Sequence, residues 1–82
     1  MVTPESIEAA LAAGLDCRHL TVRGDGHHFE ALIVSPEFAG LNRVRRHQRV
    51  YAALGERMGG EIHALSMTTL TPEEWQAQGG GA

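Results

Sequence analysis

Apolar residues follow a helical spacing of three to four residues in some segments and a strand spacing of two in others. Each change from one spacing to the other marks the boundary of an expected element. Near the start, Ile7 and Leu11 lie one helical turn apart, which is the spacing of a buried helix face. Three signals of a helix start come before them. Thr3 can cap the helix, Pro4 suits the first helical position, and Glu5 suits the positive end of the helix dipole. The pattern predicts a helix over about 4–13, ended by Gly14.

A β-hairpin is expected next, because apolar and polar residues alternate over 19–23 and residues 27–35 are strand-like in composition. The segment from Gly24 to Gly26 between them contains residues that tolerate a positive φ. In the second strand, one face carries Phe29, Ala31 and Ile33, whereas Leu32 and Val34 make the far end apolar on the other face as well. A strand covered on both sides at one end is expected at the centre of a sheet.

The longest helix is predicted over about 43–57, with Asn42 as its cap and Gly59-Gly60 as its stop. Its apolar residues fall within an arc of about 120° on a helical wheel. They are Val44, Val50, Tyr51, Leu54 and Met58. On the opposite side lie Arg45, Arg46 and Arg49. The pattern predicts an amphipathic helix whose outer face is rich in arginine.

The C-terminal part adds a strand and a short helix. Residues 61–70 are strand-like, and Thr71 and Glu74 then form a capping box around Pro72. The order is α-β-β-α-β-α, and a crossover helix between the second and third strands implies that these two are parallel. We expect one α+β domain over 1–78, with a three-stranded mixed sheet and helices packed on one face, followed by a disordered tail over 79–82.

Composition restricts the function classes. A chain of 82 residues, 43% of them hydrophobic, buries one thin core, which disfavours an enzyme with a deep pocket. The sequence also shows no grouping of nucleophile, base and orienting residue. The lone Cys17 rules out an internal disulfide and is interpreted as structural. Because no signal-peptide pattern is present and no segment approaches the roughly 20 apolar residues of a membrane span, we expect a cytoplasmic protein without a membrane anchor.

Charge is unevenly distributed along the chain. The net charge is −3, yet residues 43–58 are strongly basic. This segment would bind nucleic acid if Arg45, Arg46 and Arg49 contacted phosphates. Against this, the chain is acidic overall, and the EFAG turn before the helix lacks the GxxG loop with which KH domains clamp a nucleic-acid backbone. A solvated helix face, or a docking surface for an acidic partner, explains the arginines equally well.

Two long segments resemble the BolA family. They are HFEALIVSPEFAGLNRVRRHQRVYAAL, residues 28–54, and EIHALSMTTLTPEEW, residues 61–75. The short GDGHHF turn is closest to the YrbA-like bacterial branch, and the similarity runs from about Ile7 to Gln76. The resemblance implies a class II KH-like fold and a non-enzymatic protein that binds a monothiol glutaredoxin in iron-sulfur trafficking or iron homeostasis. The family has also been linked to DNA binding and transcriptional regulation.

The resemblance further implies a shared [2Fe-2S] cluster. The glutaredoxin supplies a cysteine and a glutathione, and this chain supplies the histidine of its IHA segment, His63. A second family ligand lies in the hairpin loop, where His27 and His28 are the candidates. Adjacent strand residues point to opposite faces, so these two cannot both reach one metal. From the strand pattern alone, His63 would be an ordinary hydrogen-bonded histidine. As a ligand in place of thiolate, it would reduce the negative charge of the cluster.

The other conspicuous side chains are interpreted as structural. His47 lies near the middle of the apolar arc of its helix and is expected at the edge of the core. Tyr51 and Trp75 are expected to be core or helix-anchoring aromatics. Because one protein ligand cannot hold a cluster, the isolated chain is expected to carry none. On its own the chain is expected to be a monomer or a weak homodimer.

Overall fold

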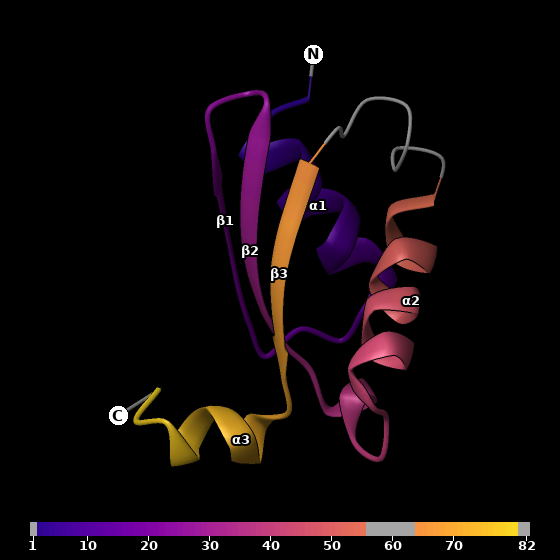
Figure 1. Cartoon of the computed structure of the whole chain (residues 1–82), viewed down its shortest axis with the longest axis vertical. Helices are drawn as coiled ribbons and strands as arrows, with labels where there is room; N and C mark the ends of the chain where they lie inside the picture. The colour runs from indigo at the N-terminus through magenta and orange to yellow at the C-terminus, as the bar shows by residue number, and fades with distance from the viewer. Residues whose placement is uncertain (1, 56–63, 81–82) are drawn as a thin grey trace.

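The computed structural model describes residues 2–55 and 64–80, and its elements follow the predicted order (Figure 1). The helices are α1 (Pro4–Gly14), α2 (Arg43–Leu54) and α3 (Pro72–Ala77), and a short 3-10 helix, η1 (Pro36–Phe38), precedes α2. The strands are β1 (His19–Gly24), β2 (His28–Val34) and β3 (Ala64–Leu70). Met58, His63 and the predicted Gly59-Gly60 stop lie outside the described residues.

The strands form one mixed sheet in the order β1-β2-β3. β1 and β2 are antiparallel, with Val22 opposite Ala31, and β2 and β3 are parallel, with Ala31 opposite Met67. The α+β class, the central position of β2 and the parallel pairing across the α2 crossover are therefore confirmed.

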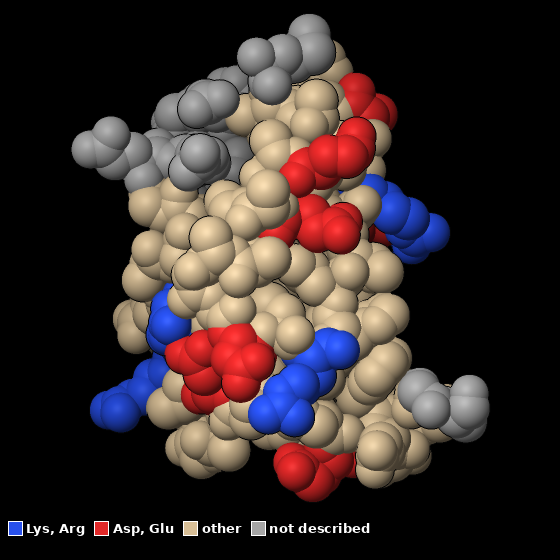
Figure 2. Space-filling view, turned by 180° about the vertical axis from the view of Figure 1, so that it is seen from behind, with Lys and Arg blue, Asp and Glu red and all other residues tan. Residues whose placement is uncertain are grey.

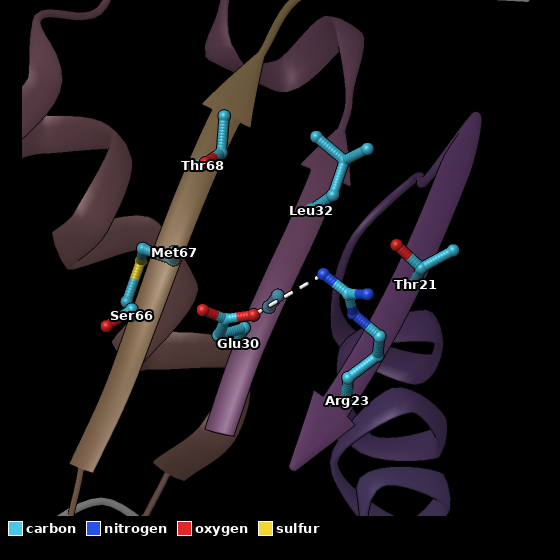
Figure 3. Close-up of a pocket in the computed structure, with 8 residues that line it drawn as sticks. Thr21, Arg23, Glu30, Leu32, Ser66, Met67 and Thr68 are labelled. Carbon is cyan, nitrogen blue, oxygen red and sulfur yellow. Dashed lines mark hydrogen bonds and ion pairs between the residues drawn. The ribbon is translucent and has the colours of Figure 1, made fainter. Parts of the chain in front are cut away.

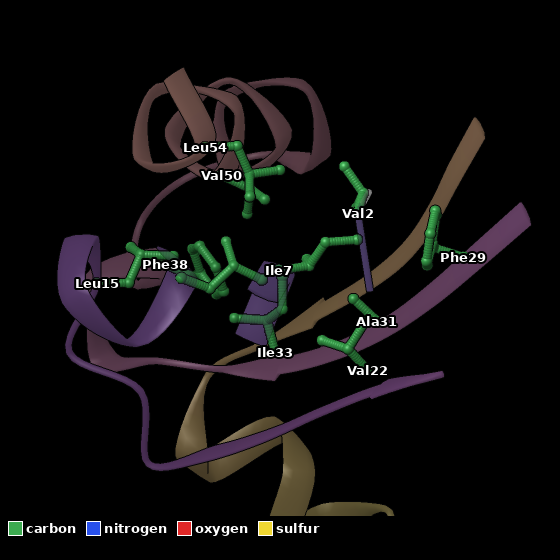
Figure 4. Close-up of a cluster of buried hydrophobic side chains, with 11 residues drawn as sticks. Val2, Ile7, Leu15, Val22, Phe29, Ala31, Ile33, Phe38, Val50 and Leu54 are labelled. Atoms are coloured by element: carbon green, nitrogen blue, oxygen red, sulfur yellow. The ribbon is translucent and has the colours of Figure 1, made fainter. Parts of the chain in front are cut away.

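The helices α1 and α2 cover one face of the sheet, and the hydrophobic core lies between them and the strands (Figure 4). Its largest fully buried side chains are Ile7, Leu11, Phe29, Ile33, Phe38, Val50 and Leu54. On the other face, Thr21, Arg23 and Glu30 are exposed. This second face, the open face, is therefore largely uncovered.

The helix α3 covers one end of the open face, so it lies on the opposite side of the sheet from α1 and α2. Val22 points into the core, so alternation places His19 on the open face. The His19 ring stacks on Trp75 of α3, with ring centroids 4.4 Å apart and an interplanar angle of 25°. Val34, which is opposite His19 in the ladder, is fully buried on this side. The prediction that Trp75 anchors the last helix is confirmed.

The predicted N-terminal caps of α2 and α3 are present, but the predicted end of the long helix is wrong, because α2 ends at Leu54 with Gly55 as its C-cap at a φ of 62°. Asn42 Oδ1 accepts a hydrogen bond from the backbone N–H of Arg45 at 2.9 Å. Thr71 and Glu74 form the reciprocal capping box, with bonds of 2.8 and 3.1 Å. Beyond α3, the backbone N–H of Gly80 donates to the Trp75 carbonyl at 2.9 Å. Of the predicted disordered tail, only residues 81–82 lie outside the described residues.

Burial along α2 differs from the predicted apolar arc. Val50 and Leu54 are fully buried, but Val44 is 63% exposed and Tyr51 is 40% exposed. The buried side of the helix instead includes Arg46, whose side chain is 14% exposed. A charged residue can occupy this inward position because it finds hydrogen-bond and ion-pair partners there. The prediction of Tyr51 as a core aromatic and of Arg46 as part of an outer face is wrong.

Candidate functional site

Two of the three candidate cluster ligands lie at the hairpin end of the sheet. His27 and His28 are both exposed. His63 lies outside the described residues, but the next residue, Ala64, is the first of β3 and pairs with His28 in the parallel ladder. The fold therefore brings His28 beside the residue that follows His63 in the chain.

Asp25 shapes the turn that presents these histidines. Its Oδ1 atom accepts hydrogen bonds from the backbone N–H of His28 at 2.8 Å and of His27 at 2.9 Å. These two bonds lower the pKa of Asp25, since they favour its charged form. Gly26 completes the turn with a φ of 97°, a conformation that favours glycine. Because the turn uses the backbone of the histidines, their imidazole rings are left to make other contacts.

The ring of His28 borders the open face of the sheet. Its Nε2 atom lies 3.4 Å from Ser66 Oγ on β3. A shallow concavity of about 250 Å³ lies on this face. Arg23 and Glu30, which line it, form an exposed pair at 3.4 Å (Figure 3). The concavity is polar and open to solvent, so it offers a surface for a large partner rather than an enclosed pocket for a small substrate.

The described residues do not complete a metal site by themselves. Within 2–55 and 64–80, no group of three or more His, Cys, Asp or Glu side chains is arranged to hold a metal ion. His27 and His28 each offer an exposed imidazole, which suits iron as a neutral ligand. An iron-sulfur cluster bound here would need further ligands from His63, from a partner protein or from both.

Arg46 joins three parts of the fold. Its guanidinium donates to the carbonyl oxygens of Leu41 at 2.8 Å and Thr69 at 3.1 Å. It also pairs with both carboxylate oxygens of Glu74, at 2.7 and 3.2 Å. This bidentate pair, together with the bond from the Thr71 backbone, lowers the pKa of Glu74 to about 2. The donors of Arg46 are thus committed within the chain.

Arg49 is committed in a similar way. Its Nη2 atom donates to the Gly14 carbonyl at 2.9 Å and to Glu37 Oε1 at 2.8 Å. The other carboxylate oxygen of Glu37 accepts from the backbone N–H of Asp16 at 2.7 Å. The bond from Asp16 and the pair with Arg49 both lower the pKa of Glu37. Arg49 therefore connects α2 to the end of α1 and to η1.

Of the three arginines considered for phosphate binding, Arg45 alone is exposed and without an ion pair in the part of the chain that the structure describes. Arg43, which the sequence pattern did not single out, is exposed as well. Figure 2 shows positive and negative side chains interspersed over the α1 and α2 face instead of one continuous basic patch. Sequence spacing could not reveal this arrangement, because Arg49 and Arg46 pair with glutamates 12 and 28 residues away.

Cys17 and His47 have the positions expected of structural residues. Cys17 is half-buried against the core, and burial raises the pKa of its thiol ahead of the nearby charges of Asp16 and Glu37. A raised pKa disfavours the reactive thiolate. His47 is half-buried on α2, as predicted for a residue at the edge of the core.

Comparison with known proteins gives a consistent result. Residues 2–74 match the family model described as BolA-like protein. Over 60 residues, the chain is 47% identical to the DNA-binding transcriptional regulator BolA of Haemophilus influenzae, covering 73% of this chain and 58% of that protein's length. Over 70 residues, it is 39% identical to the acid stress protein IbaG of Escherichia coli K12, covering 84% of this chain and 83% of that protein.

A solved structure agrees with the sequence relatives. The structure of a bolA protein homologue from Coxiella burnetii has a TM-score of 0.83 and 44% identity, covering 93% of this chain and 99% of that one. Within the described residues, no helix is both long enough and apolar enough to cross a membrane. The matched family model, the identity to bacterial relatives and the shared fold lead to one conclusion, which is that this chain belongs to the BolA family.

Proposed function

We propose that this chain is a cytoplasmic adaptor that binds a monothiol glutaredoxin and shares a bridging [2Fe-2S] cluster with it, in iron-sulfur trafficking or iron homeostasis. His63 supplies one ligand to the cluster, and His28 or His27 is the candidate for a second. The glutaredoxin supplies its own cysteine and a glutathione. The cluster is the cargo of the complex, and the isolated chain carries none.

The pairing of His28 with Ala64 is the observation that carries this proposal. It means that an exposed imidazole at the start of β2 lies beside the residue next to His63. The Asp25 turn supports the proposal because it holds the hairpin backbone without using the imidazole rings. The names of the bacterial relatives, a transcriptional regulator and a stress protein, agree with a role other than catalysis.

The test mixes the chain with a glutathione-loaded monothiol glutaredoxin that carries a cluster, and records visible absorption and circular dichroism. We expect His63→Ala to change both spectra, since an iron would lose its imidazole ligand. Comparing His27→Ala with His28→Ala identifies the second ligand. His19→Phe is the matched control, because it removes an imidazole while preserving an aromatic ring against Trp75.

The outcomes separate two parts of the proposal. Spectra of the His63→Ala complex that match those of the wild type would refute the ligand assignment. If no complex forms between the unmodified chain and the glutaredoxin, the adaptor role itself is wrong.

A second candidate function is DNA-binding regulation, which rests on the name of the Haemophilus influenzae relative. The structure changes which arginines could serve it, because Arg46 and Arg49 are committed within the fold. Arg43 and Arg45, both exposed in the first turn of α2, are the available cations. They would contact phosphates from the N-terminal end of the helix.

The test of this second function replaces both arginines by glutamate. Arg43→Glu with Arg45→Glu should weaken DNA binding and reduce the slope of log affinity against log salt by about 0.9 for each phosphate that the chain no longer neutralises. Arg18→Glu with Arg23→Glu makes the same change of charge elsewhere on the surface and is the matched control. Equal effects of the two double variants would show that net charge alone, and not this helix, governs binding.

A further inference from the structure

The outer edge of β3 is an unpaired strand edge within the described part of the chain, since β3 pairs with β2 only. The Leu70 carbonyl accepts from Ser35 N–H at 3.0 Å and so faces the β2 side. The Thr69 carbonyl accepts from Arg46 at 3.1 Å and so faces outward. Because backbone groups alternate in direction along a strand, the N–H and C=O groups of Met67 also face outward. Outward-facing backbone groups are a template for an additional strand.

A groove of about 460 Å³ runs along this edge, between the first half of α2 and α3. In Figure 1, β3 lies between β2 and α2. We term this groove the β3 groove, and its lining includes Arg43, Arg46, His47, Met67, Thr68 and Thr69. One of its sides is therefore strand backbone, to which an extended segment can hydrogen-bond.

The charge of the β3 groove is positive. Glu74 also lines it, but both carboxylate oxygens pair with Arg46, so these two charges compensate each other. Arg43 is exposed and has no ion pair with any described residue. It stands in the first turn of α2, where the helix dipole adds partial positive charge. Carboxylate side chains are therefore the complementary chemistry.

The lining also bears on the class of partner. No Phe, Tyr or Trp is among the described residues that line the β3 groove, so single-stranded nucleic acid would find no such ring on which to stack its bases. A polypeptide, in contrast, can satisfy the outward backbone groups of Met67 with its own main chain.

We propose that the β3 groove binds an extended acidic segment of a partner protein, which adds to the sheet as a fourth strand beside β3. The main chain of the segment bonds to the outward groups of Met67 and to the Thr69 N–H, and a carboxylate pairs with Arg43. Arg46 already occupies the Thr69 carbonyl, so it limits how far the added strand extends. This inference goes beyond the proposed cluster adaptor, because it requires neither a cluster nor His28.

The test follows backbone amide chemical shifts of the 15N-labelled full chain during titration with a six-residue probe, acetyl-Thr-Asp-Val-Asp-Val-Thr-amide. We expect shifts at Met67, Thr69 and Arg43. N-methylation of alternate amides removes hydrogen-bond donors from the probe, and should weaken binding by about tenfold or more. Replacing both aspartates of the probe by lysine should weaken binding by about tenfold at low salt.

Two variants of the chain locate the site. Arg43→Glu should weaken binding of the acidic probe by about tenfold, since it reverses the charge at the groove. Arg45→Glu is the matched control, because Arg45 is exposed on the same helix but does not line the groove. Both residues are exposed, so both variants should fold, and their amide spectra check this.

Five outcomes would overturn the proposal, four of them in the probe experiments. These are the absence of shifts at Met67 and Thr69, equal binding of the N-methylated probe, equal weakening by Arg45→Glu, and a stronger response of the same amides to oligothymidine than to the peptide. Shifts at these amides that depend on chain concentration without any probe would also overturn it, since a second copy of the chain would then occupy the edge. No glutaredoxin is present in the test, so its result is independent of the cluster proposal.

Discussion

The two ends of the sheet are held in different ways. At one end, which we term the bonded end, Arg46 and Glu74 tie α2 to α3, and Arg49 ties α2 to α1 and η1. At the other, the hairpin end, His27 and His28 are exposed and the turn is held through its backbone. Charged residues can therefore serve the fold at one end of a sheet while exposed histidines are available for binding at the other.

Arg46→Ala breaks the bonded end with the largest expected effect. The change removes two hydrogen bonds to backbone carbonyls and leaves Glu74 without its partner. We expect the free energy of unfolding to fall by about 2–3 kcal/mol, because carbonyls that are partly buried are left without their donors. Urea denaturation measures this decrease. Arg45→Ala is the matched control and should change the free energy by less than about 0.5 kcal/mol. Equal decreases would contradict the structural role of Arg46.

Gly14→Ala tests the contact between α1 and α2 at the bonded end. A Cβ atom on Gly14 would lie 2.8 Å from Ala53 Cβ, so the two helices would have to separate. We expect overpacking to lower the free energy of unfolding by about 1–2 kcal/mol, measured by urea denaturation. Ala53→Gly removes the shortest contact but leaves Ala53 Cα 3.1 Å from the added Cβ, so Gly14→Ala should cost less in that variant than in the wild type, though not nothing. An undiminished decrease in the double variant would show that the contact with Ala53 Cβ is not the cause.

Glu74→Gln tests the bonded end through pH. The pKa of Glu74 is about 2 in the fold and 4.5 in its ordinary range, so its ion pair stabilises the fold above about pH 4.5 and is lost as pH falls towards 2. The wild type should therefore melt at a higher temperature than Glu74→Gln at pH 7, and the difference should shrink by pH 3. Glu73→Gln, at an exposed neighbouring position, should give a smaller difference at pH 7. A difference for Glu74→Gln that is the same at both pH values would contradict the ion pair.

The fold could be predicted from local patterns. Leu32 and Val34 made one end of β2 apolar on both faces, which indicated a central strand, and Val34 is fully buried. The capping residues Asn42 and Thr71 act within three residues of their partners, so their roles were visible in sequence. The assignment to the YrbA-like branch rests on the short hairpin turn and stays a prediction.

The bonded end could not be predicted, because its partners are distant in sequence. On a helical wheel, Arg46 lies opposite the apolar residues and is therefore predicted to face outward. In the structure, its contacts with Thr69 and Glu74 stabilise an inward position. The same error left Tyr51 in the predicted core, although it is 40% exposed. A helical wheel assumes that the large apolar residues decide which side is buried, whereas here a well-partnered arginine and the small Ala53 lie on the side that packs against the rest of the fold.

His27→Ala and His28→Ala test the hairpin end and should have the smallest effect on stability. Both rings are exposed, and the contact between His28 and Ser66 is long, at 3.4 Å. We expect each change to alter the free energy of unfolding by less than about 0.5 kcal/mol in urea denaturation. Asp25→Ala is the control at the same end, and should cost more than either, because two backbone N–H groups are left without their acceptor. If His28→Ala destabilised the chain as much as Arg46→Ala, both ends of the sheet would be structural and His28 would not be available to bind a partner.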